Sequence, residues 1–154
     1  MKQGNIDNCE LLATISGLAE RDSTAGKKAG KALRDLFLTK KLNDAGCYAL
    51  KVNINGEDRV VVVDDWFPVK RSKKGEIKSA FAKSRQGDNE IWPLIIEKVW
   101  AKICGSYEAS EGYSVSDAFR FLAGGPSTEF QIADFRTDIK RGPGVSVERF
   151  DKFW

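Results

Sequence analysis

The sequence predicts an α+β fold that is mainly helical and contains one β-hairpin. Apolar residues recur at helical spacing in two segments, 9–19 and 90–103. Between these segments the period falls to two from Tyr48 to Ile54, and the pair Asn55-Gly56 then supplies a tight-turn signal. With 154 residues, of which 42% are hydrophobic, the chain is long enough to enclose one real core.

The first third of the chain is expected to form two helices. Asn8 is a good N-cap residue for the first helix. Its apolar stripe consists of Leu11, Leu12, Ile15, Leu18 and Ala19. Ser23 or Thr24 then begins a lysine-rich second helix that runs to about Lys40. The buried stripe of that second helix consists of Ala32, Leu33, Leu36 and Phe37.

The middle of the chain is expected to hold the hairpin, a loop and a long helix. The return strand contains residues 60–63, and the basic residues 70–75 follow as a solvated loop. Asp88 or Asn89 can cap the next helix, in which Pro93 lies in the tolerated first turn. Its broad apolar face implies burial on more than one side, and it consists of Ile91, Trp92, Ile95, Ile96, Val99, Trp100 and Ile103.

A further short helix is expected before a boundary near residue 125. Gly105 is placed to stop the long helix, and Ser114 or Ser116 can start the next one. Gly124-Gly125-Pro126 ends it, so that residues 1–125 form one lobe and 126–154 only begin a second. In that last part, apolar residues indicate a strand or two and a final helix capped by Ser146, with the pattern Phe130, Ile132, Phe135, Phe150 and Trp154.

Charge and cysteine usage point to an intracellular protein of no special surface chemistry. The net charge of +3 is too small to argue for a nucleic-acid or membrane partner. The longest apolar run, Val60 to Val63, is far shorter than a bilayer span, and the opening residues lack the pattern of a secretion signal. Three widely spaced cysteines without CxxC spacing fit free thiols in a reducing compartment, such as the cytoplasm, rather than disulfides or zinc.

Two residues near the amino terminus could carry chemistry. Cys9 falls in the first turn of a helix, where unpaired amides and the helix dipole favour a nucleophilic thiolate. Gln3 lies six residues upstream, and its side-chain amide could stabilise an oxyanion if the loop folds back. By itself the pair is weak, because a lone cysteine on an apolar helix is more often an inert core residue.

The surrounding segments resemble the calpain family of thiol proteases. Residues 3–13, QGNIDNCELLA, resemble its nucleophile segment, Gln-Gly-x-Leu-Gly-Asp-Cys-Trp-Phe/Leu-Leu-Ala. Residues 61–68 are similar to its Val-Val-Val-Asp-Asp-x-Leu-Pro, and residues 90–102 to its Glu-Phe-Trp-x-x-Leu-Leu-Glu-Lys-Ala-Tyr-Ala-Lys. Residues 105–109 and 122–125 complete the pattern in the family's order. The resemblance implies the amino-terminal half of a papain-like fold, whose second, β-rich lobe carries the family's histidine and asparagine.

The same resemblance argues against catalysis by this chain. Cysteine-protease chemistry needs an imidazole to hold the thiolate and to protonate the leaving amine, and the chain contains no histidine. Asp7, Asn8 and Glu10 replace the family's glycine, aspartate and tryptophan around the cysteine. A carboxylate at position 10 is expected to raise the pKa of the Cys9 thiol, the reverse of activation.

Two further family features are altered. A Gly-Gly pair that lets substrate backbone approach the cleft reads Gly112-Tyr113 here, and the phenol would obstruct that approach. Calpains also bind calcium through a glutamate matched by Glu90, but the second ligand, upstream of Gln3, has no counterpart. The ordinary reading of Glu90 is a charge in a helix's first turn. No cofactor is therefore expected.

Three interpretations of function follow. The first is a non-catalytic lobe that acts as a structural or interaction module, with protein partners covering the carboxyl-terminal segment. The second is the nucleophile half of an active calcium-dependent endopeptidase, with Cys9 as nucleophile, Gln3 as oxyanion donor, and histidine and asparagine supplied from outside this chain. The third and weakest is an adaptor for an acidic partner or nucleic acid through Lys27, Lys28, Lys31 and the basic residues 70–74.

Overall fold

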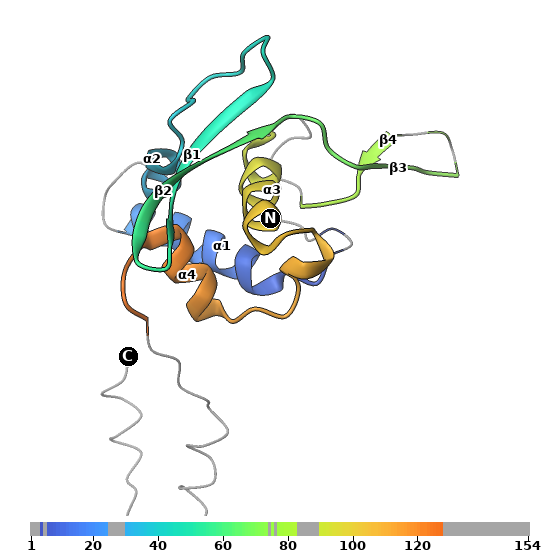
Figure 1. Ribbon diagram of the computed structural model, residues 1–154. Helices are drawn as coiled ribbons and strands as arrows, with labels where there is room; N and C mark the ends of the chain where they lie inside the picture. Colours follow the sequence, from blue (N-terminus) through green and yellow to red (C-terminus); the bar gives the residue numbers. More distant parts are fainter. Residues whose placement is uncertain are drawn as a thin grey trace, which may run out of the picture.

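The α+β prediction is confirmed by the computed structural model, which describes residues 4, 6–24, 30–73, 75, 77–82 and 90–127. The fold combines helices with two separate antiparallel sheets of two strands each (Figure 1). Along the chain the elements are α1 (Cys9–Thr24), α2 (Lys31–Leu36), β1 (Cys47–Ile54), β2 (Glu57–Asp64), β3 (Val69–Arg71), β4 (Ile77–Ser79), α3 (Trp92–Cys104), the 3₁₀ turn η1 (Glu108–Ser110) and α4 (Val115–Ala123). No described helix is both long enough and apolar enough to cross a membrane.

Helix α1 has the expected start and buried stripe but a later end. Leu11, Leu12, Ile15 and Leu18 are all buried. Asn8 occupies the N-cap position as predicted, but its carboxamide points into the protein and bonds Glu97. The cap is made by its backbone carbonyl, which accepts from the Leu11 and Leu12 amides. The helix runs on to Thr24, so Ser23 and Thr24 end it and do not begin the next one.

The second helix is much shorter than its lysine-rich pattern indicated. Helix α2 has six residues, begins after Gly30 in a left-handed conformation (φ 69°), and ends where Phe37 becomes extended. Phe37 forms a β-bridge with Leu50, and the Leu38 amide donates to the Ala49 carbonyl. Pairing with the edge of β1 therefore ends the helix, although helical propensity alone favours its continuation to Lys40. Of the expected stripe, Leu33 is buried and the other members are partly buried.

The β1–β2 hairpin is confirmed in position and register. Ile54 faces Glu57, and the intervening Asn55 and Gly56 have positive φ values of 53° and 87°, as a two-residue type I′ turn requires. Tyr48, Leu50 and Val52 place one face in the core. The basic stretch that follows was expected to be only a loop, but Val69–Arg71 pairs with Ile77–Ser79 to make a second hairpin, which projects away from the rest of the fold (Figure 1).

Helix α3 forms the centre of the core. Ile95, Ile96, Val99 and Trp100 are buried, as its broad apolar face predicted. The prediction of a cap at Asp88 or Asn89, which lie outside the described residues, is wrong because the helix begins later, with Ile91 as its N-cap. Pro93 occupies the first turn, where its missing N–H has no helical partner to lose. Gly105 ends the helix with a φ of 105°.

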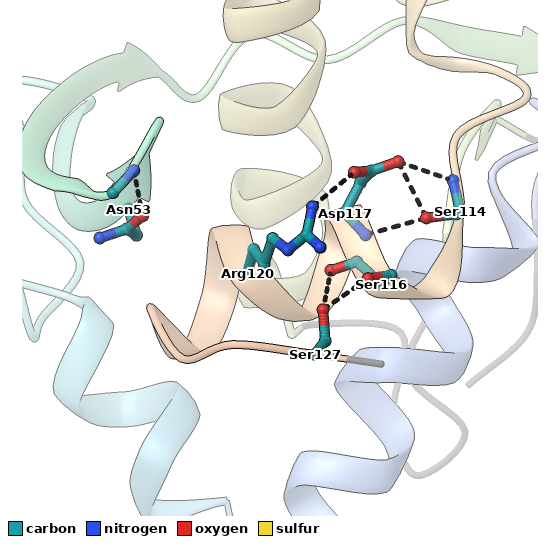
Figure 2. A network of polar contacts seen from close by, with 7 residues as sticks. Asn53, Ser114, Ser116, Asp117, Arg120 and Ser127 are labelled. Atoms are coloured by element: carbon teal, nitrogen blue, oxygen red, sulfur yellow. Dashed lines mark hydrogen bonds and ion pairs between the residues drawn. The ribbon is translucent and has the colours of Figure 1, made fainter. Parts of the chain in front are cut away.

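Helix α4 starts at Ser114, one of the two expected serines. The Ser114 hydroxyl accepts from the Asp117 amide at 3.1 Å, and the Asp117 carboxylate accepts from the Ser114 amide at 3.2 Å, which is a capping box (Figure 2). The other serine, Ser116, instead bonds Ser127, beyond the helix end (Figure 2). Gly124 ends α4 in a left-handed conformation. The strands and helix expected from Phe130 onward lie outside the described residues.

Two lysines of α3 tie this helix to the hairpin. Lys102 Nζ donates to the Val62 carbonyl at 2.7 Å, and Lys98 Nζ donates to the Trp66 carbonyl at 2.6 Å and to the Asp64 carboxylate. Asp64 also accepts from the Trp66 amide at 2.8 Å. Asp64 thus ends strand β2 and shapes the turn that follows it.

Candidate active site

Cys9 is the first residue of α1, and its side chain is exposed. The alternative that Cys9 is a buried core residue is therefore wrong. The position at the amino-terminal end of a 16-residue helix places the sulfur beside amides without intrahelical partners. Gln3, the expected oxyanion donor, lies outside the described residues.

The stretch before Cys9 is packed against the segment that follows β4. A Cβ atom on Gly4 would lie 2.5 Å from the Ala80 carbonyl oxygen and closer still to the Phe81 Cα, so only glycine fits. Ile6 is 7% exposed and packs with Ala80 and Phe81 in a small apolar cluster, and Tyr107 stacks on Phe81 with ring centroids 4.2 Å apart. This cluster fixes the path of the chain toward Cys9.

A buried carboxylate is hydrogen-bonded to Asn8, the residue before the candidate nucleophile. Glu97 of α3 is 1% exposed, and its Oε1 accepts from Asn8 Nδ2 at 2.6 Å. Its Oε2 accepts from the Ala82 amide at 3.0 Å. Burial raises the pKa of Glu97, and the hydrogen bonds from Asn8 and Ala82 offset part of that rise.

This burial predicts a pH-dependent contribution to stability. Because the folded protein holds the Glu97 proton more tightly than the unfolded chain, the contribution is complete below the ordinary pKa of 4.5 and is lost as pH rises through the higher folded value. The variant Glu97→Gln cannot titrate at this site. As pH falls from about 8 to about 5, the free energy of unfolding of the wild type should rise relative to that of Glu97→Gln. Urea unfolding of both proteins at each pH measures this difference. A difference that stays constant with pH contradicts this assignment.

Glu10 is turned away from the surface on which Cys9 lies. Its side chain is 7% exposed, and its charge adds to burial in raising the pKa of the Cys104 thiol, which a hydrogen bond with Tyr113 partly offsets. The Glu10 carboxylate thus acts on Cys104 at the end of α3. The expected effect of Glu10 on Cys9 stays a prediction.

Tyr113 lies against the core. Its ring meets Trp100 edge-on with centroids 5.0 Å apart, and 40% of the residue remains exposed. Interaction with the Cys104 thiol raises the pKa of the Tyr113 phenol. Gly112 has a φ of 76°, but no atom lies within 4 Å of a Cβ built on it. Its backbone conformation, and not a close neighbour within the described chain, accounts for glycine here. The predicted obstruction of a substrate by Tyr113 stays a prediction.

Glu90 offers little to a metal ion. It is exposed, it precedes the helix whose first turn it was expected to occupy, and its carboxylate accepts from Trp92 Nε1 at 3.3 Å. Calcium takes six to eight oxygen ligands. Within the described ranges, His, Cys, Asp and Glu side chains form no group of three that could hold a metal. Calcium binding at Glu90 stays a prediction.

Sequence reasoning missed Glu97 and the contact between Cys104 and Tyr113. For Glu97 a signal was present, since Pro93, Glu97 and Ala101 share one buried stripe of α3, where a carboxylate must find partners. For Cys104 and Tyr113 no such signal exists, because a loop of irregular structure brings them together.

The sequence of the chain is similar to that of a known protein family. The sequence pattern of the family described as "Calpain family cysteine protease" matches residues 1–144. The chain belongs to the calpain family. Its mixed helix-and-sheet fold is consistent with the papain-like amino-terminal lobe of a calpain protease core, as the motifs predicted.

Plant and animal calpains are among the relatives. The chain is 38% identical over 142 residues to the calpain-type cysteine protease DEK1 of Zea mays, covering 92% of this chain and 6% of the relative. It is 34% identical over 142 residues to DEK1 of Arabidopsis thaliana, with the same coverage of both chains. It is 32% identical over 139 residues to the calpain-1 catalytic subunit of Homo sapiens, covering 89% of this chain and 18% of the relative. The chain thus spans a small part of these calpains.

Proposed function

We propose that this calpain-type domain is a non-catalytic lobe that serves as an interaction module within a larger protein assembly. The observation that carries the proposal is the absence of histidine from all 154 residues. Peptide-bond cleavage by a thiol needs a group that takes up the thiol proton and returns it to the leaving amine. Within this chain no imidazole can do so. The proposed role requires no cofactor.

The surroundings of Cys9 support a packing role for its neighbours. The side chains of Asn8 and Glu10 are 0% and 7% exposed. Asn8 bonds Glu97, and Glu10 lies in the interior, so neither is presented to a substrate beside the thiol. Both residues differ from the family's nucleophile motif, and both are buried in the interior of the lobe.

An exposed apolar row on the outer face of the hairpin supports the interaction role. Ala49 of β1 is paired with Val62 of β2. On the other edge of β1 the Leu38 amide donates to the Ala49 carbonyl. Leu38 and Val62 are 53% and 47% exposed, and the neighbouring Val60 is 58% exposed. Contiguous exposed apolar side chains of this kind are typical of protein contact surfaces. The described cysteines are free thiols, which supports a reducing intracellular compartment for such an assembly.

A second candidate is favoured by the position of Cys9. Its side chain is exposed at a helix start, in the register of the calpain nucleophile. In this alternative the chain is the nucleophile half of a calcium-dependent cysteine endopeptidase, and a histidine and an asparagine come from outside these residues. Gln3 would then donate to the oxyanion.

Labelling with a peptidyl thiol-directed electrophile separates the two candidates. The native assembly would be treated, and wild type would be compared with Cys9→Ala and with Cys47→Ala, since Cys47 is also exposed. For a non-catalytic lobe we expect no labelling that depends on Cys9 beyond the level at Cys47, because no base activates either thiol. Selective labelling that is lost only in Cys9→Ala would overturn the proposal in favour of the endopeptidase.

A further inference from the structure

We propose that Glu97 is a positioning residue that fixes the nucleophile segment, by holding the residue before Cys9 and the segment after β4 with its two oxygens. Nothing in the family motif assigned it this task. The inference holds for a catalytic and for a non-catalytic lobe alike, because it concerns where Cys9 is held and not what Cys9 does.

The geometry uses the whole carboxylate. Oε1 accepts from Asn8 Nδ2 at 2.6 Å and Oε2 from the Ala82 amide at 3.0 Å, so each oxygen serves a different segment of chain. Glu97 is 1% exposed and Asn8 is 0% exposed. Water therefore does not compete for these hydrogen bonds. Leaving the buried carboxylate without them would strongly destabilise the folded protein. None of the ion pairs recorded among the described residues includes Glu97.

The two donors belong to segments that also meet elsewhere. Gly4 touches the backbone of Ala80 and Phe81 so closely that a Cβ would not fit. Ala82 follows directly and is bound by Glu97, which also binds Asn8. The contacts thus close a ring from Gly4 through Phe81, Ala82 and Glu97 to Asn8. The stretch from Gly4 to Asn8 is held at both ends.

The Asn8 backbone transmits this restraint to the helix. Its carbonyl accepts from the Leu11 and Leu12 amides at 3.1 and 3.3 Å, so it forms the first turn of α1, which carries Cys9. Fixing the Asn8 side chain therefore fixes the start of the helix and the direction of the Cys9 side chain. Loss of the Glu97 contacts should leave the body of α1 intact and free its first turn.

Two substitutions of Glu97 separate loss of the hydrogen bonds from their retention. Glu97→Ala removes both acceptors. Glu97→Gln keeps both links if the Asn8 carboxamide turns over, because the new amide can accept from Ala82 and donate to Asn8 Oδ1, for which the structure shows no hydrogen bond. Asn8→Leu breaks only the link to the nucleophile segment and serves as the second variant if Glu97→Ala does not fold.

The test measures local exchange and thiol reactivity in the whole chain. Hydrogen exchange of the Ala82 amide is compared with that of amides in the β1–β2 pair, and alkylation of Cys9 by iodoacetamide is compared with that of Cys47. For Glu97→Ala we expect Ala82 exchange to rise about tenfold relative to the hairpin, with a change of about threefold or more in the Cys9-to-Cys47 rate ratio. Glu97→Gln should stay within about twofold of wild type on both measures. Asn8→Leu should change the rate ratio in the same direction as Glu97→Ala.

Three results would overturn the inference. The first is wild-type behaviour of both Glu97→Ala and Asn8→Leu. The second is a uniform rise of exchange at Ala82 and in the hairpin, which is the mark of general destabilisation without local positioning. The third is an equal loss in Glu97→Gln and Glu97→Ala, because the glutamine variant retains the proposed links.

Discussion

Replacing Trp100 with alanine should lower the free energy of unfolding by about 3–5 kcal/mol, the range for truncating a large buried aromatic. Trp100 is 4% exposed, and its ring contacts Phe121 and Tyr113 at centroid distances of 4.8 and 5.0 Å. Its Nε1 donates to the Ser110 carbonyl at 3.3 Å. The substitution therefore leaves a cavity between α3 and α4 and a buried carbonyl without its donor. Urea unfolding followed by circular dichroism measures the loss.

A matched control is available in the same chain. Trp66 is 84% exposed, so Trp66→Ala should change the free energy of unfolding by no more than about 0.5 kcal/mol. Comparable losses in the two variants would contradict the placement of Trp100 at the centre of the core.

Replacing Gly4 with alanine should cost about 1–3 kcal/mol, as overpacking of a well-packed site does. The added Cβ would lie 2.5 Å from the Ala80 carbonyl oxygen and against the Phe81 backbone, and neither can rotate away as a side chain could. We expect the segment before Cys9 to separate from residues 80–82. Urea unfolding gives the cost in stability.

Gly17→Ala is the contrasting substitution for Gly4→Ala. Gly17 lies within α1 and is exposed, and apart from its own stretch of helix no described residue comes within 4 Å of a Cβ built on it. Alanine there should raise the free energy of unfolding by about 0.5–1 kcal/mol, because glycine is a poor helix residue. If Gly4→Ala is as harmless as Gly17→Ala, the close contact of Gly4 with residues 80–81 is not present in solution.

The elements that the sequence predicted well are those governed by local chemistry. The β1–β2 hairpin follows from strict alternation and from Asn55-Gly56, whose positive φ values few other residue pairs tolerate. The broad apolar face of α3 and the Ser114 cap are equally local signals. Helix α2 was mispredicted because a distant partner, Leu50 of β1, draws Phe37 into an extended bridge. No pattern within residues 31–40 carries that information.

The candidate site divides along the same line. The place of Cys9 at the start of a helix could be predicted, because the apolar stripe and the motif fix the helix start to within a residue. Asn8 was assigned to capping, the common role of its residue type, but Glu97 competes for it from 89 residues away. The contact of Cys104 with Tyr113 depends on the irregular turn around η1, which propensity does not specify.

The two lysines of α3 have a consequence for how molecules of this lobe behave toward one another. Among the described residues strand β2 pairs only with β1, so its other edge presents backbone groups, next to the apolar Val60 and Val62 of the outer face. An extended segment from a second molecule could hydrogen-bond to such an edge and start aggregation. Here the ammonium of Lys102 occupies the Val62 carbonyl on that edge, and Lys98 does the same at Trp66 just beyond the strand. An incoming strand would have to displace these ammonium groups, so we expect that the hairpin keeps its apolar outer face without pairing with copies of itself.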